Sequence, residues 1–113
     1  AYWHTVKTDS GEKWESILQL YNVLLQQEYS PLAALNRVYA FSRVFGKTEA
    51  IEEAEILMLS DNHYYFTLLG ELYTDLDNKK AIENFQKAFS KARNMTDQRT
   101  LQRKIDELIK QGS

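Results

Sequence analysis

Residues 65–92 read YFTLLGELYTDLDNKKAIENFQKAFSKA, and this stretch decides the fold. Its apolar side chains recur every three or four residues on both sides of a polar break at Asp77 and Asn78. That spacing places them along one face of each of two helices. Because the break is short, the two helices are expected to pack against each other as an antiparallel hairpin.

The residues before this stretch repeat its pattern at an offset of 31 positions. The tripeptide Ala-Ile-Glu at 50–52 recurs at 81–83. The other matching pairs at this offset are Leu35 with Phe66, Val38 with Leu69, Ala54 with Phe85 and Leu57 with Ala88. A period of this size indicates an array of helical hairpins. No segment alternates with a period of two, so we predict an all-α fold.

Turn and capping residues divide the chain into six predicted helices. Asp9 and Glu12 have the spacing of a capping box, and the helix that they start is expected to stop near Glu28. The remaining boundaries are Ser30-Pro31 at the start of the second helix, Gly46 at its end, Thr48 as the cap of the third, and breaks at 60–62, 77–78 and 94–96.

Each predicted helix has an apolar stripe that should face the core. The second helix is apolar on most sides and is expected to lie between others. The stripes of the first, third, fourth and sixth helices include Trp14, Ile17, Leu18, Tyr21, Leu24, Leu25, Ala50, Ile51, Ala54, Leu57, Met58, Tyr65, Phe66, Leu69, Leu72, Tyr73, Leu76, Leu101, Ile105, Leu108 and Ile109.

The length of 113 residues fits one domain with a core of its own. Tyr2 and Trp3 are unusual so close to a chain end, so we assign residues 1–8 to the tail of an upstream helix and residues 9–111 to the helical domain. The chain has no cysteine, which excludes disulfides and thiolate chemistry, and no apolar run long enough to cross a membrane.

The second hairpin resembles a tetratricopeptide repeat. Phe66, Leu69, Gly70 and Tyr73 have the spacing of that family's Trp, Leu, Gly and Tyr, and Ala81, Phe85 and Ala88 match the Ala, Phe and Ala of its second helix. A side chain in place of Gly70 would hold the paired helices apart. The first hairpin departs from the pattern, with Tyr39 at the glycine position and Ser42 at the tyrosine position. The predicted architecture is therefore about two tetratricopeptide-like repeats with flanking capping helices.

Residues suited to catalysis or metal binding do not form a recognisable group. The two histidines, His4 and His63, have no ligand partners at metal-binding spacing. The densest acidic cluster lies in the first half of a predicted helix, where the macrodipole favours acidic residues, so it needs no functional explanation. It comprises Glu49, Glu52, Glu53 and Glu55. We expect no enzyme activity, no cofactor, no metal and no small-molecule substrate.

The charges divide unevenly along the chain. Residues 1–78 hold five basic and twelve acidic side chains, whereas residues 79–113 hold nine basic and four acidic ones. The basic side chains that could form a nucleic-acid surface are Lys87, Lys91, Arg93, Arg99, Arg103 and Lys104. Phe85 and Phe89 are expected to face the core instead of stacking with bases, so DNA contact is an alternative rather than the main prediction.

The predicted binding site is the groove that the first helices of such repeats line. The register of the repeat places Asn36, Ala40 and Arg43 of one unit and Tyr64, Thr67 and Glu71 of the next in this groove. Arg37 lies beside them and is included among the candidate site residues. Asn36 and Arg37 stand out because they interrupt an apolar helix. The alternative is that Asn36 bonds a neighbouring loop while Arg37 extends to water.

A longer pattern resembles the C-terminal extension of bacterial extracytoplasmic-function RNA polymerase sigma factors. It comprises Trp14, Ile17, Leu20-Tyr21, Ser30-Pro31, Ala34-Leu35-Asn36-Arg37, Gly46, Ala50, Tyr64, Gly70, Ala81, Phe85, Ala88, Asn94, Arg99, Leu101 and Arg103. The departures are Tyr39, Phe41 and the Asn-Lys-Lys turn at 78–80. The resemblance implies a cytoplasmic bacterial domain that contacts its own sigma domains, RNA polymerase or another protein, with promoter DNA read only by domains outside this chain.

Three functions follow as hypotheses. The first is regulation of a sigma factor through protein contacts. The second is a stand-alone tetratricopeptide adaptor that binds a peptide in its groove. The third is nucleic-acid contact through the basic C-terminal helices.

Overall fold

The computed structural model describes residues 11–112, which fold into six α-helices and contain no strand. The predicted all-α class is confirmed. The helices are α1 (Gly11–Gln27), α2 (Pro31–Phe45), α3 (Lys47–Leu57), α4 (His63–Tyr73), α5 (Asn78–Lys91) and α6 (Met95–Gly112). The expected helix start at Asp9 and the segment 1–8 lie outside the described residues.

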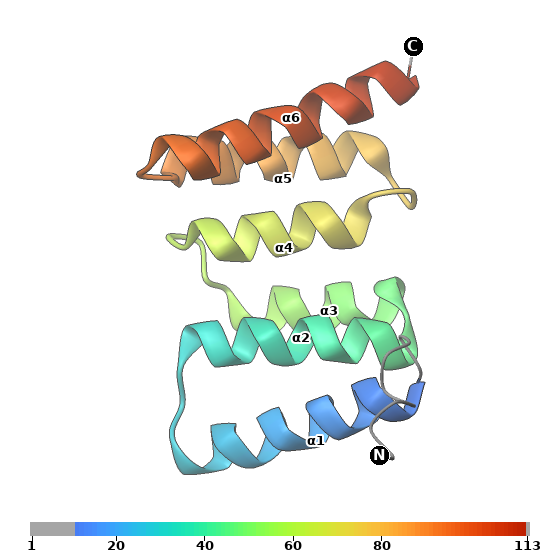
Figure 1. Cartoon of the computed structure of the whole chain (residues 1–113), viewed down its shortest axis with the longest axis vertical. Coiled ribbons are helices and arrows are strands. Elements are labelled where there is room, and N and C mark those ends of the chain that lie inside the picture. Colours follow the sequence, from blue (N-terminus) through green and yellow to red (C-terminus); the bar gives the residue numbers. More distant parts are fainter. Residues whose placement is uncertain (1–10, 113) are drawn as a thin grey trace, which may run out of the picture.

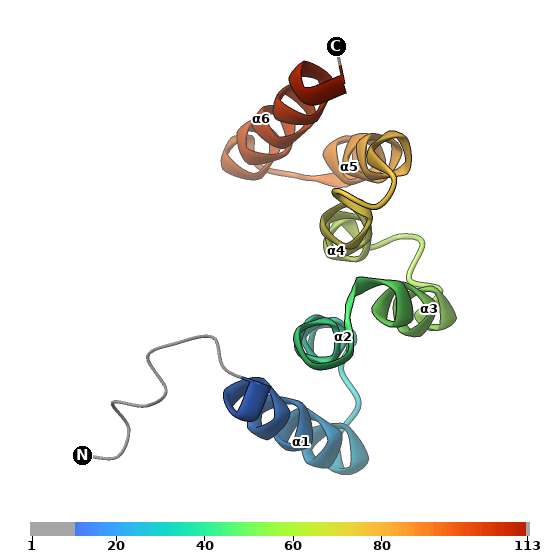
Figure 2. The same cartoon turned by 90° about the vertical axis from the view of Figure 1, so that its right-hand side faces the viewer.

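Successive helices reverse direction and stack along the long axis of the molecule (Figure 1). Figure 2 shows that α3 and α5 lie on one side of α2 and α4, whereas α1 and α6 stand on the other side at the two ends of the stack. Helix α2 packs against α3, and α4 packs against α5, as predicted for the two hairpins. Helix α2 also contacts α4. This arrangement is compatible with tetratricopeptide-like repeats.

The 31-residue equivalences are reproduced in the core. Leu35, Val38 and Ala54 are buried, and so are their equivalents Phe66, Leu69 and Phe85. One continuous cluster of buried side chains runs from α2 to α6. Its largest side chains with almost no exposure are Val38 and Phe85, one in each hairpin.

Side-chain caps start four of the helices. The Oγ of Ser30 accepts a hydrogen bond from the backbone N–H of Ala33 at 3.3 Å, and Pro31 occupies the first turn as predicted. Asn62 and Asp77 accept from the backbone N–H groups of Tyr64 and Lys80. The Oδ1 of Asn94 accepts from the N–H of Asp97 at 2.8 Å.

The predicted cap at Thr48 is wrong. Gly46 is the single residue that ends α2 and starts α3, and no side chain caps α3. Its φ of 103° lies in the region that favours glycine, so one residue can reverse the chain. Thr48 already lies inside the first turn of α3 and is exposed.

Four residues assigned to the core are exposed instead. Leu24 of α1 is 42% exposed, and the other three lie near helix ends. Met58 ends α3 in a left-handed conformation, and Leu76 lies beyond the end of α4 at Tyr73. Ile109 is one position past Leu108, so it turns away from the stripe of α6 that is buried. Their exposed fractions are 79%, 52% and 53%. The stripe of α1 is also only partly covered, with Leu18 as its buried residue.

The closest approach of two helices occurs between α4 and α5 at Gly70. A Cβ atom at this position would lie 2.5 Å from Cε1 and 2.6 Å from Cδ1 of Phe85. The Phe85 ring is 1% exposed, so moving it aside would disturb the core around it. The glycine is needed because this ring fills the position that a side chain would occupy.

In the first hairpin the sizes of the two equivalent side chains are reversed. Tyr39 stands at the position of Gly70, and Ala54 stands at the position of Phe85. Ala54 is fully buried, whereas Tyr39 is 42% exposed. A large side chain on one helix is thus matched by a small one on its partner in both hairpins.

We predict that Gly70→Ala destabilises the domain. Alanine gains about 1 kcal/mol in helix propensity, but the clash with a buried ring costs about 2–3 kcal/mol. The net loss of about 1–2 kcal/mol in the free energy of unfolding can be measured by urea denaturation.

Gly11→Ala is the matched control, because a Cβ at Gly11 has no neighbour within 4 Å. The same Gly70→Ala change made in a Phe85→Leu background should cost much less. Equal losses in both backgrounds would show that the ring is not the obstacle.

Candidate functional site

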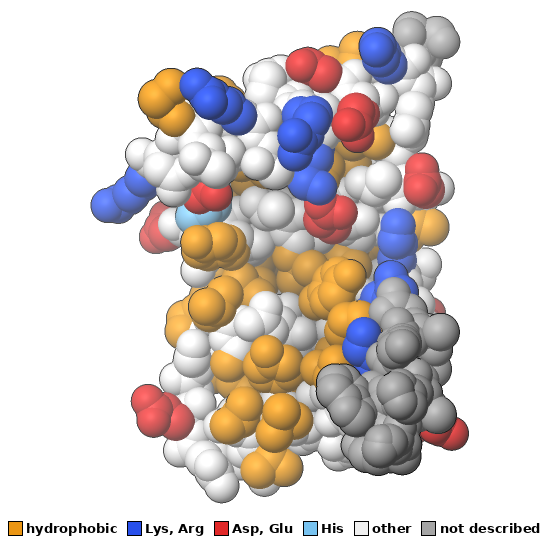
Figure 3. Space-filling view, viewed as in Figure 1, with side chains coloured by type: hydrophobic (Ala, Val, Ile, Leu, Met, Phe, Trp, Pro, Cys, Tyr) orange, Lys and Arg blue, Asp and Glu red, His pale blue; other side chains and the backbone are white. Residues whose placement is uncertain are grey.

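The predicted groove corresponds to the surface of α2 and α4 between α1 and α6, which we call the concave face (Figure 2). Leu32, Asn36, Tyr39 and Arg43 are exposed on α2 and follow each other at intervals of three and four residues. They therefore share one side of the helix. Figure 3 shows hydrophobic side chains gathered over the half of this view that α1 and α2 occupy, and charged side chains over α6.

An aromatic and basic cluster lies where α1 meets α2. The rings of Trp14 and Tyr39 pack edge to face with centroids 5.4 Å apart. The guanidinium of Arg43 lies over the Trp14 ring at 5.4 Å, within the range of a cation–π interaction. These residues line a hollow of about 320 Å³ together with Ser42, Lys47, Glu71 and Leu72.

Lys47 connects this hollow to the second hairpin. Its Nζ donates a hydrogen bond of 2.9 Å to the backbone carbonyl of Thr74. Because Thr74 is the C-cap of α4, the lysine satisfies backbone at the end of that helix and holds α3 beside it. Sequence analysis missed Lys47, Trp14 and Tyr39 as members of the site. The available signal was that Tyr39 and Arg43 are four residues apart on one helix.

Glu71 also lines the hollow, but its carboxylate already has a partner. It forms an ion pair with Lys104 of α6, and both side chains are partly exposed. The contact ties α6 to α4 in addition to its packing on α5. Glu71 therefore contributes to holding the sixth helix in place.

Tyr64 and Thr67 lie at the opposite end of α4, beside the start of α6. They line a small hollow of about 80 Å³ with His63, Asp97, Thr100 and Leu101. The hydroxyl of Thr67 donates to the carbonyl of His63 at 2.9 Å, whereas Tyr64 is 51% exposed. Tyr64 thus presents an aromatic surface at the edge of the concave face.

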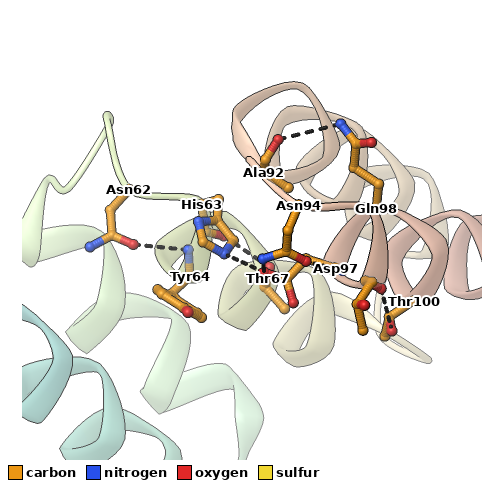
Figure 4. Close-up of polar contacts among 10 residues, drawn as sticks. Asn62, His63, Tyr64, Thr67, Ala92, Asn94, Asp97, Gln98 and Thr100 are labelled. Atoms are coloured by element: carbon orange, nitrogen blue, oxygen red, sulfur yellow. Dashed lines mark hydrogen bonds and ion pairs between the residues drawn. The ribbon is translucent and has the colours of Figure 1, made fainter.

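Figure 4 shows that polar contacts join the two helix starts at this edge. Nε2 of His63 lies 3.5 Å from Oδ2 of Asp97. The same carboxylate oxygen accepts from Nδ2 of Asn94 at 2.9 Å. His63 is the first residue of α4, as expected from its position after the turn, and it also links α4 to α6.

Arg37 does not belong to the concave face. Its Nε donates to Oδ1 of Asn22 at 2.7 Å, and its Nη1 forms an ion pair with Oε1 of Glu53 at 3.0 Å. The partners of Arg37 thus lie on α1 and α3, so Arg37 joins three helices, and its side chain is 27% exposed.

Of the other predicted groove residues, Ala40 is fully buried and Asn36 is exposed. Arg43 and Glu71 meet in one hollow, and Tyr64 and Thr67 meet in another. The structure therefore brings four of the six candidate residues together in two hollows. Asn36 lies alone on the surface of α2, and Arg37 is separated from the other candidates.

The resolved pKa shifts belong to two tyrosines beside Glu55. Burial raises the pKa of Tyr65, and the nearby Glu55 carboxylate raises it further. Burial also raises the pKa of Tyr73, whose hydroxyl donates to Oε2 of Glu55 at 3.2 Å. Both shifts keep the phenol protonated and move the pKa away from neutrality.

Some basic side chains of the C-terminal half are engaged within the domain. Nζ of Lys87 lies 5.6 Å from the centre of the Phe66 ring. Phe85 is buried and Phe89 packs against the core, as predicted, so neither offers a stacking platform. Lys91, Arg93, Arg99 and Arg103 are exposed.

Within residues 11–112, no three His, Asp or Glu side chains come close enough together to hold a metal ion. No helix in this part of the chain is long and apolar enough to cross a membrane.

No protein-family model, curated protein or solved structure matches the chain. The resemblance to sigma-factor extensions therefore stays a prediction.

The position of Arg37 predicts a role in stability. Replacing Arg37 or Glu53 by alanine should each lower the free energy of unfolding, and a double-mutant cycle should give a coupling of about 0.5–1 kcal/mol, because the pair is partly exposed. Urea denaturation of the four proteins measures it.

Asn36→Ala is the matched control, because this neighbouring side chain is exposed. It should change the free energy of unfolding by less than about 0.5 kcal/mol. A coupling near zero, or an equal loss in the control, would contradict the role of Arg37.

Proposed function

We propose that this chain is a protein-interaction domain that binds a polypeptide on its concave face. In line with the sequence resemblance, we propose that it serves as the C-terminal regulatory domain of a cytoplasmic bacterial extracytoplasmic-function sigma factor. It would modulate transcription initiation through contacts with its own sigma domains, with RNA polymerase or with another regulator. The carrying observation is the cluster of Trp14, Tyr39 and Arg43 on the concave face.

The chemistry of this cluster suits protein recognition. Tryptophan, tyrosine and arginine dominate the binding energy of protein interfaces, since they combine large apolar area with a polar group. Tyr39 and Tyr64 are 42% and 51% exposed, so both retain surface for a partner. Within the described residues, Nε1 of Trp14 is buried without a hydrogen-bond acceptor.

The face is also organised in advance of binding. The Glu71–Lys104 ion pair holds α6 against α4, and the Lys47 hydrogen bond holds α3 beside α4. A surface that does not have to rearrange loses less conformational entropy when a partner binds. This favours a folded partner domain or a peptide over a small molecule in a closed pocket.

The test starts with the reading frame that encodes the chain. If it also encodes sigma domains, these domains are produced separately and titrated with residues 1–113 by calorimetry. We expect measurable binding, and we expect Arg43→Ala and Tyr64→Ala each to weaken it by at least fivefold, because each removes an exposed interface-type side chain.

Lys79→Ala is the control, because it removes one positive charge from an exposed position on α5. It should leave the affinity unchanged. Absence of sigma domains from the reading frame would overturn the sigma-factor assignment. Binding of a peptide alone would support the adaptor hypothesis, and salt-sensitive DNA affinity would support the nucleic-acid hypothesis.

A further inference from the structure

Helix α1 carries two apolar stripes, and only one of them is covered by α2. The first stripe has the spacing 4-3-4 and comprises Trp14, Leu18, Tyr21 and Leu25, none of which is fully exposed. The second has the spacing 3-4 and comprises Ile17, Leu20 and Leu24, next to Val23. Leu20, Val23 and Leu24 are 58%, 49% and 42% exposed. Alternating spacings of three and four are typical of a seam between two helices.

The opposite end of the stack is built differently. In α6 the apolar residues Leu101, Ile105 and Leu108 are 3–4% exposed, and the exposed side is polar and charged apart from Met95 and Ile109. A terminal helix of a repeat array needs such a polar outer face to remain soluble. Helix α1 instead leaves Leu20, Val23 and Leu24 exposed. Figure 3 shows hydrophobic side chains on the viewed face where Figure 1 draws α1.

We propose that this second stripe binds a second copy of the same chain, with the two α1 helices packed antiparallel about a twofold axis. Ile17 of each copy would lie opposite Leu24 of the other, and Leu20 would lie at the axis. Both contacts are apolar. Packing of helices through such a seam has a crossing angle of about 20°.

The charges of α1 identify the second copy as the occupant. Residues near a twofold axis face copies of themselves, so a charge there would repel its own equivalent. Residues 16–27 contain no charged side chain. The register that pairs Ile17 with Leu24 also brings Lys13 of one copy opposite Glu28 of the other. The helix is therefore complementary to itself in both its apolar and its charged positions.

Each end of the seam can accept this pairing. Lys13 lies over the Trp14 ring at 5.2 Å, and Glu28 is exposed just after the end of α1. The pairing uses a flank of α1 beside the stripe that packs on α2, because Leu20 and Leu24 together lie roughly a third of a turn around the helix from Leu18 and Tyr21. It does not use Tyr64 or Arg43, so dimerisation can be measured separately from binding on the concave face.

Sedimentation equilibrium of residues 1–113 over a range of concentrations tests the proposal. We expect a reversible monomer–dimer equilibrium, and we expect Leu20→Glu to raise the dissociation constant at least tenfold. Because Leu20 is more than half exposed, this change should leave the helical circular dichroism unaltered. A monomer at every concentration, or a dimer that Leu20→Glu does not weaken, would overturn the proposal.

Gln19→Glu is the matched control, since it adds the same charge one residue away. Gln19 lines a hollow with Val44 and Phe45, on another side of α1. It should leave the dissociation constant within about twofold of the parent value, which is under about 0.5 kcal/mol. An equal effect of both changes would show that net charge, and not the seam, controls association.

The absence of cysteine allows the register to be tested directly. A Leu20→Cys variant should form cross-linked dimers with a short bismaleimide, whereas Gln19→Cys should not. Equal cross-linking of the two variants would contradict the antiparallel seam. Titrations with sigma domains report separately on the concave face, so failure of one proposal can be told from failure of the other.

Discussion

The contact between the Phe85 ring and the backbone of Gly70 sets the distance between α4 and α5, and the rest of the structure is built around it. A helix without a side chain at one position allows a buried aromatic ring to lie directly against its backbone. The second hairpin therefore becomes the most tightly packed part of the stack. Leu69 and Leu72 on α4 and Ala81 and Ala88 on α5 complete the core at this level. The small residues allow close packing and the large ones fill the remaining space.

This hairpin also positions the surface on which binding is proposed. Helix α4 contacts α2 and α5, and its polar side chains reach α6 through Glu71 and His63. Contacts of α4 with α2, α5 and α6 therefore hold the concave face in place. The first hairpin is held differently. Arg37 of α2 bonds to Asn22 of α1 and to Glu53 of α3, so its side chain links three helices. Two kinds of contact, apolar in the second hairpin and partly ionic in the first, maintain one continuous stack.

The sequence allowed the helices and most of the core to be predicted, because both depend on spacing along the chain. The 31-residue offset correctly paired Leu35 with Phe66 and Ala54 with Phe85. The errors fell where a helix ended earlier than its apolar pattern, at Met58 and Leu76. Thr48 was taken as a cap because threonine often caps helices, but a connection of one residue left no room for a separate cap. Periodicity describes a helix well and locates its end poorly.

The candidate site was harder to predict, because it depends on contacts between residues far apart in the chain. Arg37 was placed in the groove as a polar interruption of an apolar helix. Its partners Asn22 and Glu53 are 15 and 16 residues away, so only the packing of three helices reveals its role. Glu71 and Lys104 are likewise separated by a whole hairpin. Arg43 lines one hollow with Trp14, which had been assigned to the core.

The difference between the two ends of the stack limits the size that an assembly of this domain can reach. A repeat array with two apolar ends would add further copies without limit and form filaments. Here α6 presents a charged outer surface, so growth cannot continue from that end. Pairing at α1 would use the one apolar end of each molecule and leave none for a third. The asymmetry would therefore confine self-association to a closed pair, which protects a small helical stack from polymerisation.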